Sequence, residues 1–257
     1  MRKLLITAAA SIVIFLIGFL PSAAQTGGQK AQLYYIHNYS ADPSKTADLE
    51  TFVKDLAAVF KKYSFPFAVH AYSTMDFQYY FIVPIENYAD IDSIRKTLGD
   101  ISQKMGADNF QKLIARRNAA IQHNSYFVIR YLPELSYTPP KPRHKPEEEF
   151  FRHWIFCYPH VEKEGELRAT FAKFVDLYKR INYPFTENIF TVELGSDLPL
   201  YIGEERGTNI FEFWPSVKEA YTIMGDEGGK LLWKSTLRKI ERRDGAYRPE
   251  LSYIPGK

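Results

Sequence analysis

The sequence predicts an α+β protein built from two consecutive copies of one unit. A five-residue segment, Pro133–Tyr137, returns unchanged as Pro249–Tyr253, 116 residues further on (249 − 133). Strand-like and helix-like segments follow one another in a similar order before each copy, and a proline-rich stretch separates the two halves. Self-similarity at a fixed spacing is the usual trace of a repeated structural unit.

The first 24 residues stand outside this repeat because they have the pattern of a secretory signal. Arg2 and Lys3 precede an uncharged apolar run, Leu4–Leu20, and Ser22–Ala24 supplies the small residues for cleavage after Ala24. The alternative is an uncleaved anchor, since the run is slightly long for a signal. We expect an exported protein, periplasmic or extracellular, without a stable membrane anchor after cleavage.

Composition and charge narrow the class of protein. Of the 257 residues, 46% are hydrophobic and 25% are charged, which is ample for packed cores. Cleavage after Ala24 would lower the formal net charge from +3 to about +1, so we expect no nucleic-acid partner. Cys157 is the only cysteine, and export without an internal disulfide favours a bacterial envelope protein with a full hydrophobic core.

The first half, residues 25–137, is predicted to have the order β-α-β-β-α-α-β. Asp42 and Pro43 form an N-cap followed by proline at the first helical position, and apolar residues then recur at helical spacing as far as Tyr63. Short runs of aromatic and β-branched residues predict the strands. The expected strands are 32–39, 67–73, 78–85 and 126–132, and the expected helices are 43–63, 91–105 and 109–122.

Residues 138–149 contain four prolines and are expected to form a stiff linker without helix or strand. The second half, residues 150–257, repeats the pattern, and Tyr183–Phe185 corresponds to Phe65–Phe67 at an offset of 118. Residues 207–215 have no clear counterpart. The expected strands are 150–158, 188–194 and 199–204, and the expected helices are 164–181, 216–224 and 229–242.

A unit of about 110 residues with the order βαββαβ has the ferredoxin-like plan, in which two helices cover one face of an antiparallel sheet. The other face needs a cover, because these strands carry apolar or aromatic residues on both sides. In these features residues 31–257 resemble the dimeric α/β-barrel superfamily. That group includes NIPSNAP, EthD-type and antibiotic-biosynthesis-monooxygenase-like domains, and the haem-binding chlorite-dismutase-like proteins. The resemblance implies two tandem units forming an intramolecular pseudo-dimer, but no catalytic motif of a named family is present.

His70 and Tyr72 are the candidate catalytic residues. They share one face of an otherwise apolar expected strand. A histidine in such a place is either a hydrogen-bonded core residue or a general base, metal ligand or haem ligand. Asn188 stands at the matching position of the second half, so only one half can hold a histidine-dependent site.

Tyr35, His37 and Trp154 join Asn188 as candidate ligand-pocket residues. Tyr35 and His37 alternate onto one face of the first strand, and Trp154 belongs to an aromatic set that suits either packing or a flat apolar ligand. His153 and Cys157 share a face of their strand but lie about 13 Å apart along it. That distance is too long for one metal ion, so no metal site is expected.

Charged residues of the second half are expected to face water, as charged side chains mostly do. Glu204–Gly207 is expected to be a solvated turn, and Glu187 and Glu193 are expected on the wet face of a strand. Arg238–Lys239 and Arg242–Arg243 are expected on exposed parts of a helix.

These patterns favour a protein that binds a small apolar or aromatic molecule in a cavity or cleft between its halves, with further oligomerisation open. One alternative is a monooxygenase-like or haem-binding enzyme that uses His70. The other is a structural or interaction module whose aromatic residues only pack the sheets. The repeated segment is expected to be architectural, with Leu135 and Leu251 buried, Tyr137 and Tyr253 anchoring, and each copy reaching across to the other half.

Overall fold

Eight strands of the protein form one closed antiparallel barrel, in the order β1-β3-β2-β8-β5-β7-β6-β4. The computed structural model describes residues 30–195, 197–231 and 233–256. The expected signal segment, residues 1–24, lies outside the described residues. In the part of the chain that is described, no helix combines the length and the apolar character needed to span a membrane.

The first half follows the predicted order. Asp42 accepts a hydrogen bond from the Ser44 backbone N–H at 2.9 Å, and a short 3-10 turn at Pro43–Lys45 leads into the first helix. Gly106, at φ 82°, separates the second helix from the third. The elements are β1 (Leu33–Ala41), α1 (Thr46–Lys62), β2 (His70–Thr74), β3 (Gln78–Ile85), α2 (Ala89–Met105), α3 (Ala107–Ala120) and β4 (Ile121–Tyr131).

The second half corrects two predictions. The segment expected as two helices, 216–224 and 229–242, is instead one helix that begins at Ile210 and a strand that ends at Tyr247. The proline-rich linker contains one short 3-10 turn, Pro146–Glu148. The elements are β5 (Phe151–Pro159), α4 (Glu164–Ile181), β6 (Glu187–Leu194), β7 (Tyr201–Gly207), α5 (Ile210–Gly229) and β8 (Leu237–Tyr247).

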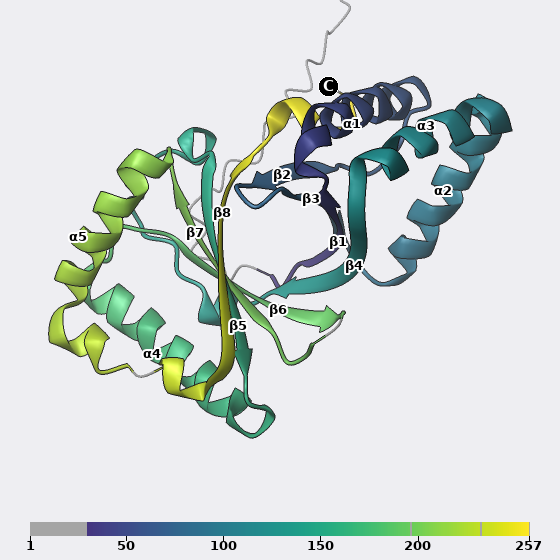
Figure 1. Ribbon diagram of the computed structural model, residues 1–257. Coiled ribbons are helices and arrows are strands. Elements are labelled where there is room, and N and C mark those ends of the chain that lie inside the picture. The colour runs from purple at the N-terminus through teal and green to yellow at the C-terminus, as the bar shows by residue number, and fades with distance from the viewer. Residues whose placement is uncertain (1–29, 196, 232, 257) are drawn as a thin grey trace, which may run out of the picture.

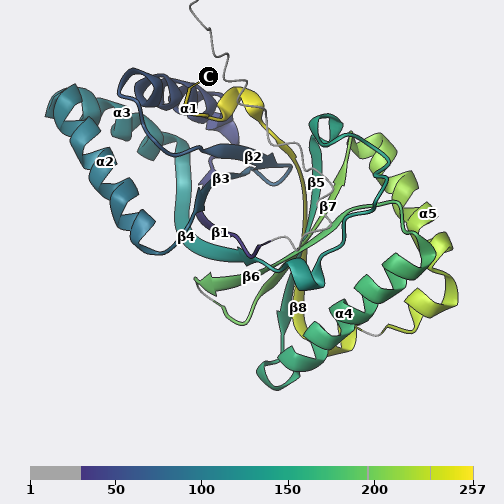
Figure 2. The same ribbon diagram turned by 180° about the vertical axis from the view of Figure 1, so that it is seen from behind.

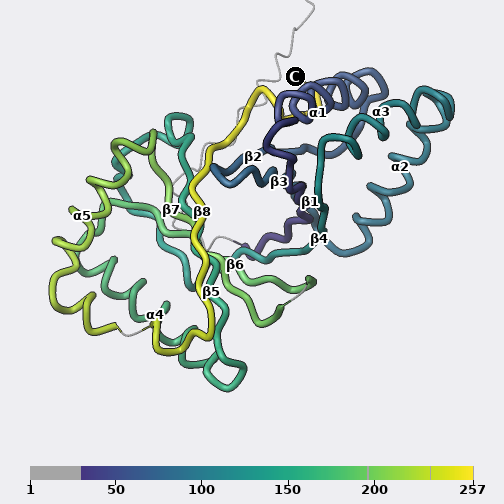
Figure 3. Tube along the Cα trace, viewed as in Figure 1, coloured from purple at the N-terminus to yellow at the C-terminus, as the bar shows by residue number. Residues whose placement is uncertain are grey.

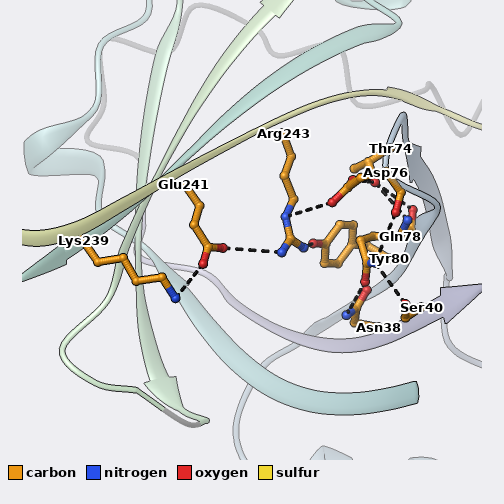
Figure 4. Close-up of polar contacts among 9 residues, drawn as sticks. All are labelled: Asn38, Ser40, Thr74, Asp76, Gln78, Tyr80, Lys239, Glu241 and Arg243. Atoms are coloured by element: carbon orange, nitrogen blue, oxygen red, sulfur yellow. Dashed lines mark hydrogen bonds and ion pairs between the residues drawn. The ribbon is translucent and has the colours of Figure 1, made fainter. Parts of the chain in front are cut away.

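The last strand was mistaken for a helix because charged residues occupy positions on both of its faces and hide the alternation typical of a strand. Arg243 points into the lumen, where it donates to the Tyr80 hydroxyl and lies 3.6 Å from Asp76 and 3.4 Å from Glu241 (Figure 4). Such pairing permits a run of charges in a closed sheet, where unpaired charges would be costly. The expectation that Arg243 lies on an exposed helix is therefore wrong.

The helices form two layers outside the barrel, one for each half. Helices α1, α2 and α3 lie on the side of β1 to β4, and α4 and α5 lie on the side of β5 to β8 (Figures 1 and 2). Each half has the same internal strand order, β4-β1-β3-β2 and β8-β5-β7-β6. The halves are joined by two equivalent seams, β2 with β8 and β4 with β6.

The two copies of the repeated segment, here called the first clasp (133–137) and the second clasp (249–253), make the same contacts on opposite halves. Tyr137 forms an antiparallel bridge with Glu187, and its hydroxyl donates to the Tyr183 carbonyl at 3.0 Å. The Ser136 hydroxyl accepts a hydrogen bond from the Ile189 backbone N–H at 2.8 Å. The first clasp therefore ties the end of the first half to β6.

The second clasp repeats each of these contacts on the first half. Tyr253 bridges Val69 and donates to the Phe65 carbonyl at 2.8 Å, and Ser252 accepts from the Ala71 backbone N–H at 2.9 Å. The C-terminal end consequently lies beside α1 (Figure 3). Leu135 and Leu251 are 6% and 2% exposed. The expectation that both copies are buried and occupy equivalent places is confirmed.

Gly245 lies where β8 crosses closest to β2, and we expect its replacement to weaken this seam. A Cβ at this position would fall inside the contact distance of the Ser73 carbonyl oxygen and 2.9 Å from Trp154 Cζ3. Gly245→Ala should therefore lower the free energy of unfolding by about 1–3 kcal/mol, as overpacking does. Urea denaturation measures the change. Gly99→Ala, with open space around it inside α2, should instead raise stability by about 0.5–1 kcal/mol.

Candidate functional site

Two cavities lie on opposite faces of the second half's sheet. The larger, about 320 Å³, separates the outer face of β5, β6 and β7 from α4 and α5; we call it the helix–sheet cavity. The smaller, about 120 Å³, lies inside the barrel; we call it the lumen cavity. Ligand pockets in proteins usually have volumes of about 300–1,000 Å³, so the helix–sheet cavity is the candidate site. Its apolar wall includes Ile155, Phe171, Phe174, Ile189, Ala220 and Met224.

Four ionisable side chains stand in a row across the outer face of the second half, beginning at the floor of this cavity. Glu187 on β6 stands opposite Glu205 on β7 in the register of the two strands, and both residues line the cavity. Glu205 is paired in turn with His153 on β5, which is paired with Asp244 on β8. Alternation along the strands places all four side chains on the face toward the helices. We call these residues the ionisable row.

The first two members, the acid pair, hold a proton more tightly than free carboxyl groups do. Burial raises the pKa of Glu187 well above its usual range, and the neighbouring charge of Glu205 raises it further. Burial also raises the pKa of Glu205, partly opposed by His153 and Arg242. The Tyr183 hydroxyl donates a hydrogen bond to Glu187 at 3.3 Å. Two adjacent half-buried carboxyls resist double ionisation, which favours a state in which the pair holds one proton.

The other two members connect the acid pair toward the surface. His153 Nδ1 lies 2.6 Å from Asp244 Oδ1, and their side chains are 5% and 21% exposed. Phe213 and Trp214 of α5 pack on the histidine ring at centroid distances of 5.4 and 5.3 Å. The hydrogen bond to Asp244 fixes the orientation of the imidazole, as second partners of functional histidines do.

At the four positions that match the ionisable row, the first half has three apolar side chains and one tyrosine. Tyr35 occupies the same place in the register of β1 with β3 and β4 as His153 does in the register of β5 with β7 and β8. Tyr35 is therefore the first-half counterpart of His153. The matching residues, in the order of the row, are Val69, Val83, Tyr35 and Val128. The three valines belong to the buried core of the first half. The fold therefore forms without these charges, and the row is a feature of the second half alone.

The expectation that Glu187 faces water is wrong, because its strand is covered by α4 and α5 and its side chain lines the cavity. Glu193, further along the strand, forms an ion pair with Arg130. The row escaped prediction because its members lie far apart in the sequence and only the strand register brings them together. The one feature of the sequence that pointed to the row was that His153 shares a strand face with Cys157. Cys157 lines the helix–sheet cavity.

The residues predicted for the site are divided between the two faces of the sheet. Tyr72, Trp154 and Asn188 point into the barrel; Tyr72 and Trp154 line the lumen cavity. His70 is half-buried on the same strand as Tyr72, with its ring 6.2 Å from that of Tyr247. It lines neither of the two cavities.

The remaining two predicted residues, Tyr35 and His37, point outward toward the first half's helices. Their rings stack on Tyr126 at centroid distances of 5.9 and 4.0 Å. Burial and the charge of Arg117 lower the pKa of His37 to about 3, so this imidazole is neutral. Neither residue borders the lumen or the helix–sheet cavity.

Glu204–Gly207, expected as a solvated turn, is the end of β7, and Glu204 is buried in the barrel. Asn188 and Arg206 donate to its Oε1 at 3.0 and 2.8 Å, and the Trp154 indole N–H donates to its Oε2 at 3.3 Å. Burial raises the pKa of Glu204, but Arg206 and Arg152 outweigh burial and hold it at about 2. The turn prediction failed because Glu204 and Arg206 are partners of each other within the strand.

The residues of the two cavities do not fit a haem. Haem iron is bound by histidine, cysteine thiolate or tyrosine, or by methionine together with histidine; Met224 lines the helix–sheet cavity, but no histidine lines either cavity. Burial raises the pKa of the Cys157 thiol to about 12 and that of Tyr178 well above its usual value, so both keep their protons. Among the described residues, no group of three or more histidine, cysteine or acidic side chains is placed to hold a metal ion.

Comparison with known proteins shows the fold. No family model and no curated protein sequence matches this chain. Among solved structures, an anthrone oxidase-like protein aligns with a TM-score of 0.59 at 6% identity, covering 90% of this chain and 96% of that one. A monooxygenase-like protein from Lactobacillus acidophilus gives 0.51 at 9% identity, covering 88% and 98%. A chlorite dismutase variant from Candidatus Nitrospira defluvii gives 0.51 at 9%, covering 87% and 94%.

Identities this low establish a shared architecture and nothing about activity. The protein is an α+β barrel of eight antiparallel strands with five helices among the described residues, and its architecture is that of the dimeric α/β-barrel proteins. The resemblance inferred from the order of its elements is confirmed at this level.

Proposed function

We propose that the protein binds a small, largely apolar or aromatic molecule in the helix–sheet cavity and exchanges a proton with it through the acid pair, Glu187 and Glu205. The cavity has the volume of a small-molecule pocket, aromatic walls and two adjoining carboxyls; its other charged lining residues are Arg206 and Lys234. This proposal places the ligand outside the barrel, beside the second half alone, rather than between the two halves.

The observation that carries the proposal is the difference between the halves at matching positions. The same fold holds valines where the second half holds Glu187, Glu205 and Asp244. Carboxyls that are partly withdrawn from water lower stability unless they are fully paired, so their presence beside a cavity favours a role in binding or chemistry. A purely structural module would not need them.

The chemistry of the acid pair defines the class of ligand. With one proton shared, the pair presents a negatively charged acceptor in apolar surroundings, which suits a phenolic hydroxyl or a protonated amine attached to an aromatic body. A raised carboxyl pKa brings a general base closer to neutral pH, where proton removal is most efficient. His153 and Asp244 extend the row toward solvent and provide a route for the proton.

A cofactor-independent monooxygenase-like activity is the second candidate. Its first step would be removal of a proton from a substrate CH2 group by the ionised acid pair. The carbanion would then form a C–O bond with dioxygen, and the resulting hydroperoxide would take a proton back and lose water, so that one oxygen atom stays on the substrate as a carbonyl and the other leaves as water. The architecture shared with monooxygenase-like and anthrone oxidase-like proteins favours this reaction class over others. The haem-dependent alternative with His70 has no support from the residues around either cavity.

Two naphthalene compounds test the proposal by titration calorimetry. We expect 1-naphthol to bind at least ten-fold more tightly than 1-methoxynaphthalene, which lacks the proton to donate, because hydrogen bonds to charged groups contribute about 1.5–3 kcal/mol. Binding of 1-naphthol should strengthen as the pH rises through the raised pKa of Glu205, because ionisation of Glu205 gives the pair the single negative charge that accepts the hydrogen bond.

Two glutamine variants provide the matched control. Glu205→Gln should abolish the preference for 1-naphthol, whereas Glu193→Gln, on the same sheet but outside the cavity, should keep it. Equal binding of both compounds to the unaltered protein, or an undiminished preference in Glu205→Gln, would contradict the proposal.

The two halves and the leader are part of the same proposal. Their common strand order and equivalent clasps support a tandem duplication of a ferredoxin-like unit, with residues 25–137 and 150–257 as the copies and 138–149 as the linker. Residues 1–24 are proposed to direct export and to be removed. Intact-mass measurement of the protein from its native host should then show a chain that starts at Gln25; a chain that retains the leader would contradict this.

A further inference from the structure

The lumen cavity has a charged end that the proposed function does not use. Arg206 lines the cavity together with Glu204, and Arg152 lies 3.6 Å from the Glu204 carboxylate. The Arg152 and Glu204 side chains are 6% and 9% exposed. We propose that the lumen cavity is a second binding site, which takes a small apolar monocarboxylate and pairs its carboxylate with these two arginines.

The charge balance points to an anion. Two guanidinium groups face one ionised carboxylate, whose pKa of about 2 keeps it charged. Glu149, just ahead of β5, also acts on both arginines; burial raises its pKa, and it does not line the lumen cavity. Both oxygens of Glu204 already accept hydrogen bonds, so a cation would gain little from it. The excess charge in this part of the lumen is therefore positive.

The first half again shows that the fold does not need these charges. In the first half, Tyr34 and Pro84 occupy the strand positions that match Arg152 and Arg206. Ile82 occupies the position that matches Glu204. Burying an unbalanced charge costs several kcal/mol unless a partner supplies compensation. A ligand carboxylate is a partner of the right sign and shape, because a guanidinium binds a carboxylate through two parallel hydrogen bonds.

The hydrogen bonding of Arg152 agrees with this. Its Nε is buried and has no hydrogen-bond partner, although almost all buried donors have one. The guanidinium lies over the Tyr72 ring at 5.8 Å, beside the lumen cavity. Burial raises the pKa of Tyr72, so its hydroxyl keeps a proton and remains a donor. Arg152 Nη1 already donates to the carbonyls of Glu149 and Phe151, so the Nε, 3.6 Å from Glu204 Oε2, is the buried donor left for a ligand carboxylate.

The rest of the cavity sets the size and polarity of the ligand. Its volume of about 120 Å³ is well below that of a drug-sized pocket, and its other walls are apolar or aromatic, including Ile36, Ile82, Phe127 and Phe156. A benzoate-sized or short-chain acid has the required form. Arg206 is 30% exposed, so the charged end lies nearest to solvent and is the side from which a ligand would enter.

Calorimetric titration of the full mature chain with benzoate and with benzamide, its uncharged analogue, tests this site. We expect benzoate to bind at least ten-fold more tightly than benzamide. Arg152→Met should weaken benzoate binding ten-fold or more and remove the preference. Ile82→Phe, which fills the lumen without touching a charge, should abolish binding of both compounds, and it keeps the test decisive if Arg152→Met does not fold.

The glutamate double variant Glu187→Val/Glu205→Val separates this site from the helix–sheet cavity. It should bind benzoate as the unaltered protein does, because neither residue borders the lumen cavity. Three results would each overturn the inference: equal affinity for benzoate and benzamide, benzoate binding that survives Ile82→Phe, or benzoate binding that is lost in the glutamate double variant. None of them bears on the 1-naphthol experiment.

Discussion

Replacing the acid pair by its counterparts from the first half, in Glu187→Val/Glu205→Val, is expected to raise the free energy of unfolding by about 1–4 kcal/mol while abolishing the preference for 1-naphthol. Two adjacent half-buried carboxyls in apolar surroundings are less stable than well-packed apolar side chains. Val69 and Val83 already occupy the matching places in the first half's core. Urea denaturation and ligand titration on the same preparation measure both effects.

The stability gained by the double variant should depend on pH in a definite direction. The acid pair has raised pKa values in the folded protein, so the folded state binds more protons than the unfolded state above the ordinary value of 4.5. The pair's contribution to stability is therefore most favourable at low pH and is lost as the pH rises from 4.5 through the folded pKa. The gain from the double variant should be small at pH 4.5 and larger at pH 8.

A control carboxyl should behave in the opposite way. Arg130 holds the pKa of Glu193 below its usual value, so its stabilising contribution is present above 4.5 and is lost on acidification. Glu193→Gln should thus lower stability at pH 8 by about 0–1 kcal/mol, as expected for a partly exposed pair. If the double variant destabilises the protein at every pH, the ionisable row is a structural element and the proposed function loses its basis.

Leu251→Ala is expected to lower the free energy of unfolding by about 2–5 kcal/mol, because it removes a buried side chain that is only 2% exposed. The second clasp holds the end of the second half against the first half, so the substitution should destabilise both halves of the barrel together. Near-UV circular dichroism and tryptophan fluorescence should therefore report one shared transition at a lower denaturant concentration.

Leu135→Ala is the matched variant, since the first clasp makes the same contacts on the other half. Its cost should fall in the same range of about 2–5 kcal/mol. A large difference between the two variants, or two separate transitions in either, would show that the clasps are not equivalent and that the halves unfold independently.

Much of the fold was predictable because local patterns and tertiary packing agree. The strand 78–85 and the helix 164–181 have the predicted bounds, since an alternating or helical apolar pattern coincides with a buried face. The repeated segment predicted an equivalence that the hydrogen bonds confirm. Residues 237–247 were mistaken because charged residues at most positions hide the alternation of a strand whose partners lie on other strands.

The site was less predictable because periodicity shows which residues share one face of a strand. It does not show whether that face points into the barrel or toward the helices. His70 was rightly grouped with Tyr72, but the inner face on which they lie borders only the small lumen cavity. Tyr35 and His37 were rightly grouped with each other and point the opposite way. Which strands are neighbours decides that Glu187 meets Glu205, and no local pattern contains that information.

The order in which the barrel closes has a consequence for synthesis. Strand β2 is made early, but one of its two edges is covered only by β8, the last strand of the chain. Until residues 237–247 have left the ribosome, that edge is an open template for pairing with other chains. During synthesis of residues 75–236, β2 therefore has one edge that only a later segment of the same chain can cover.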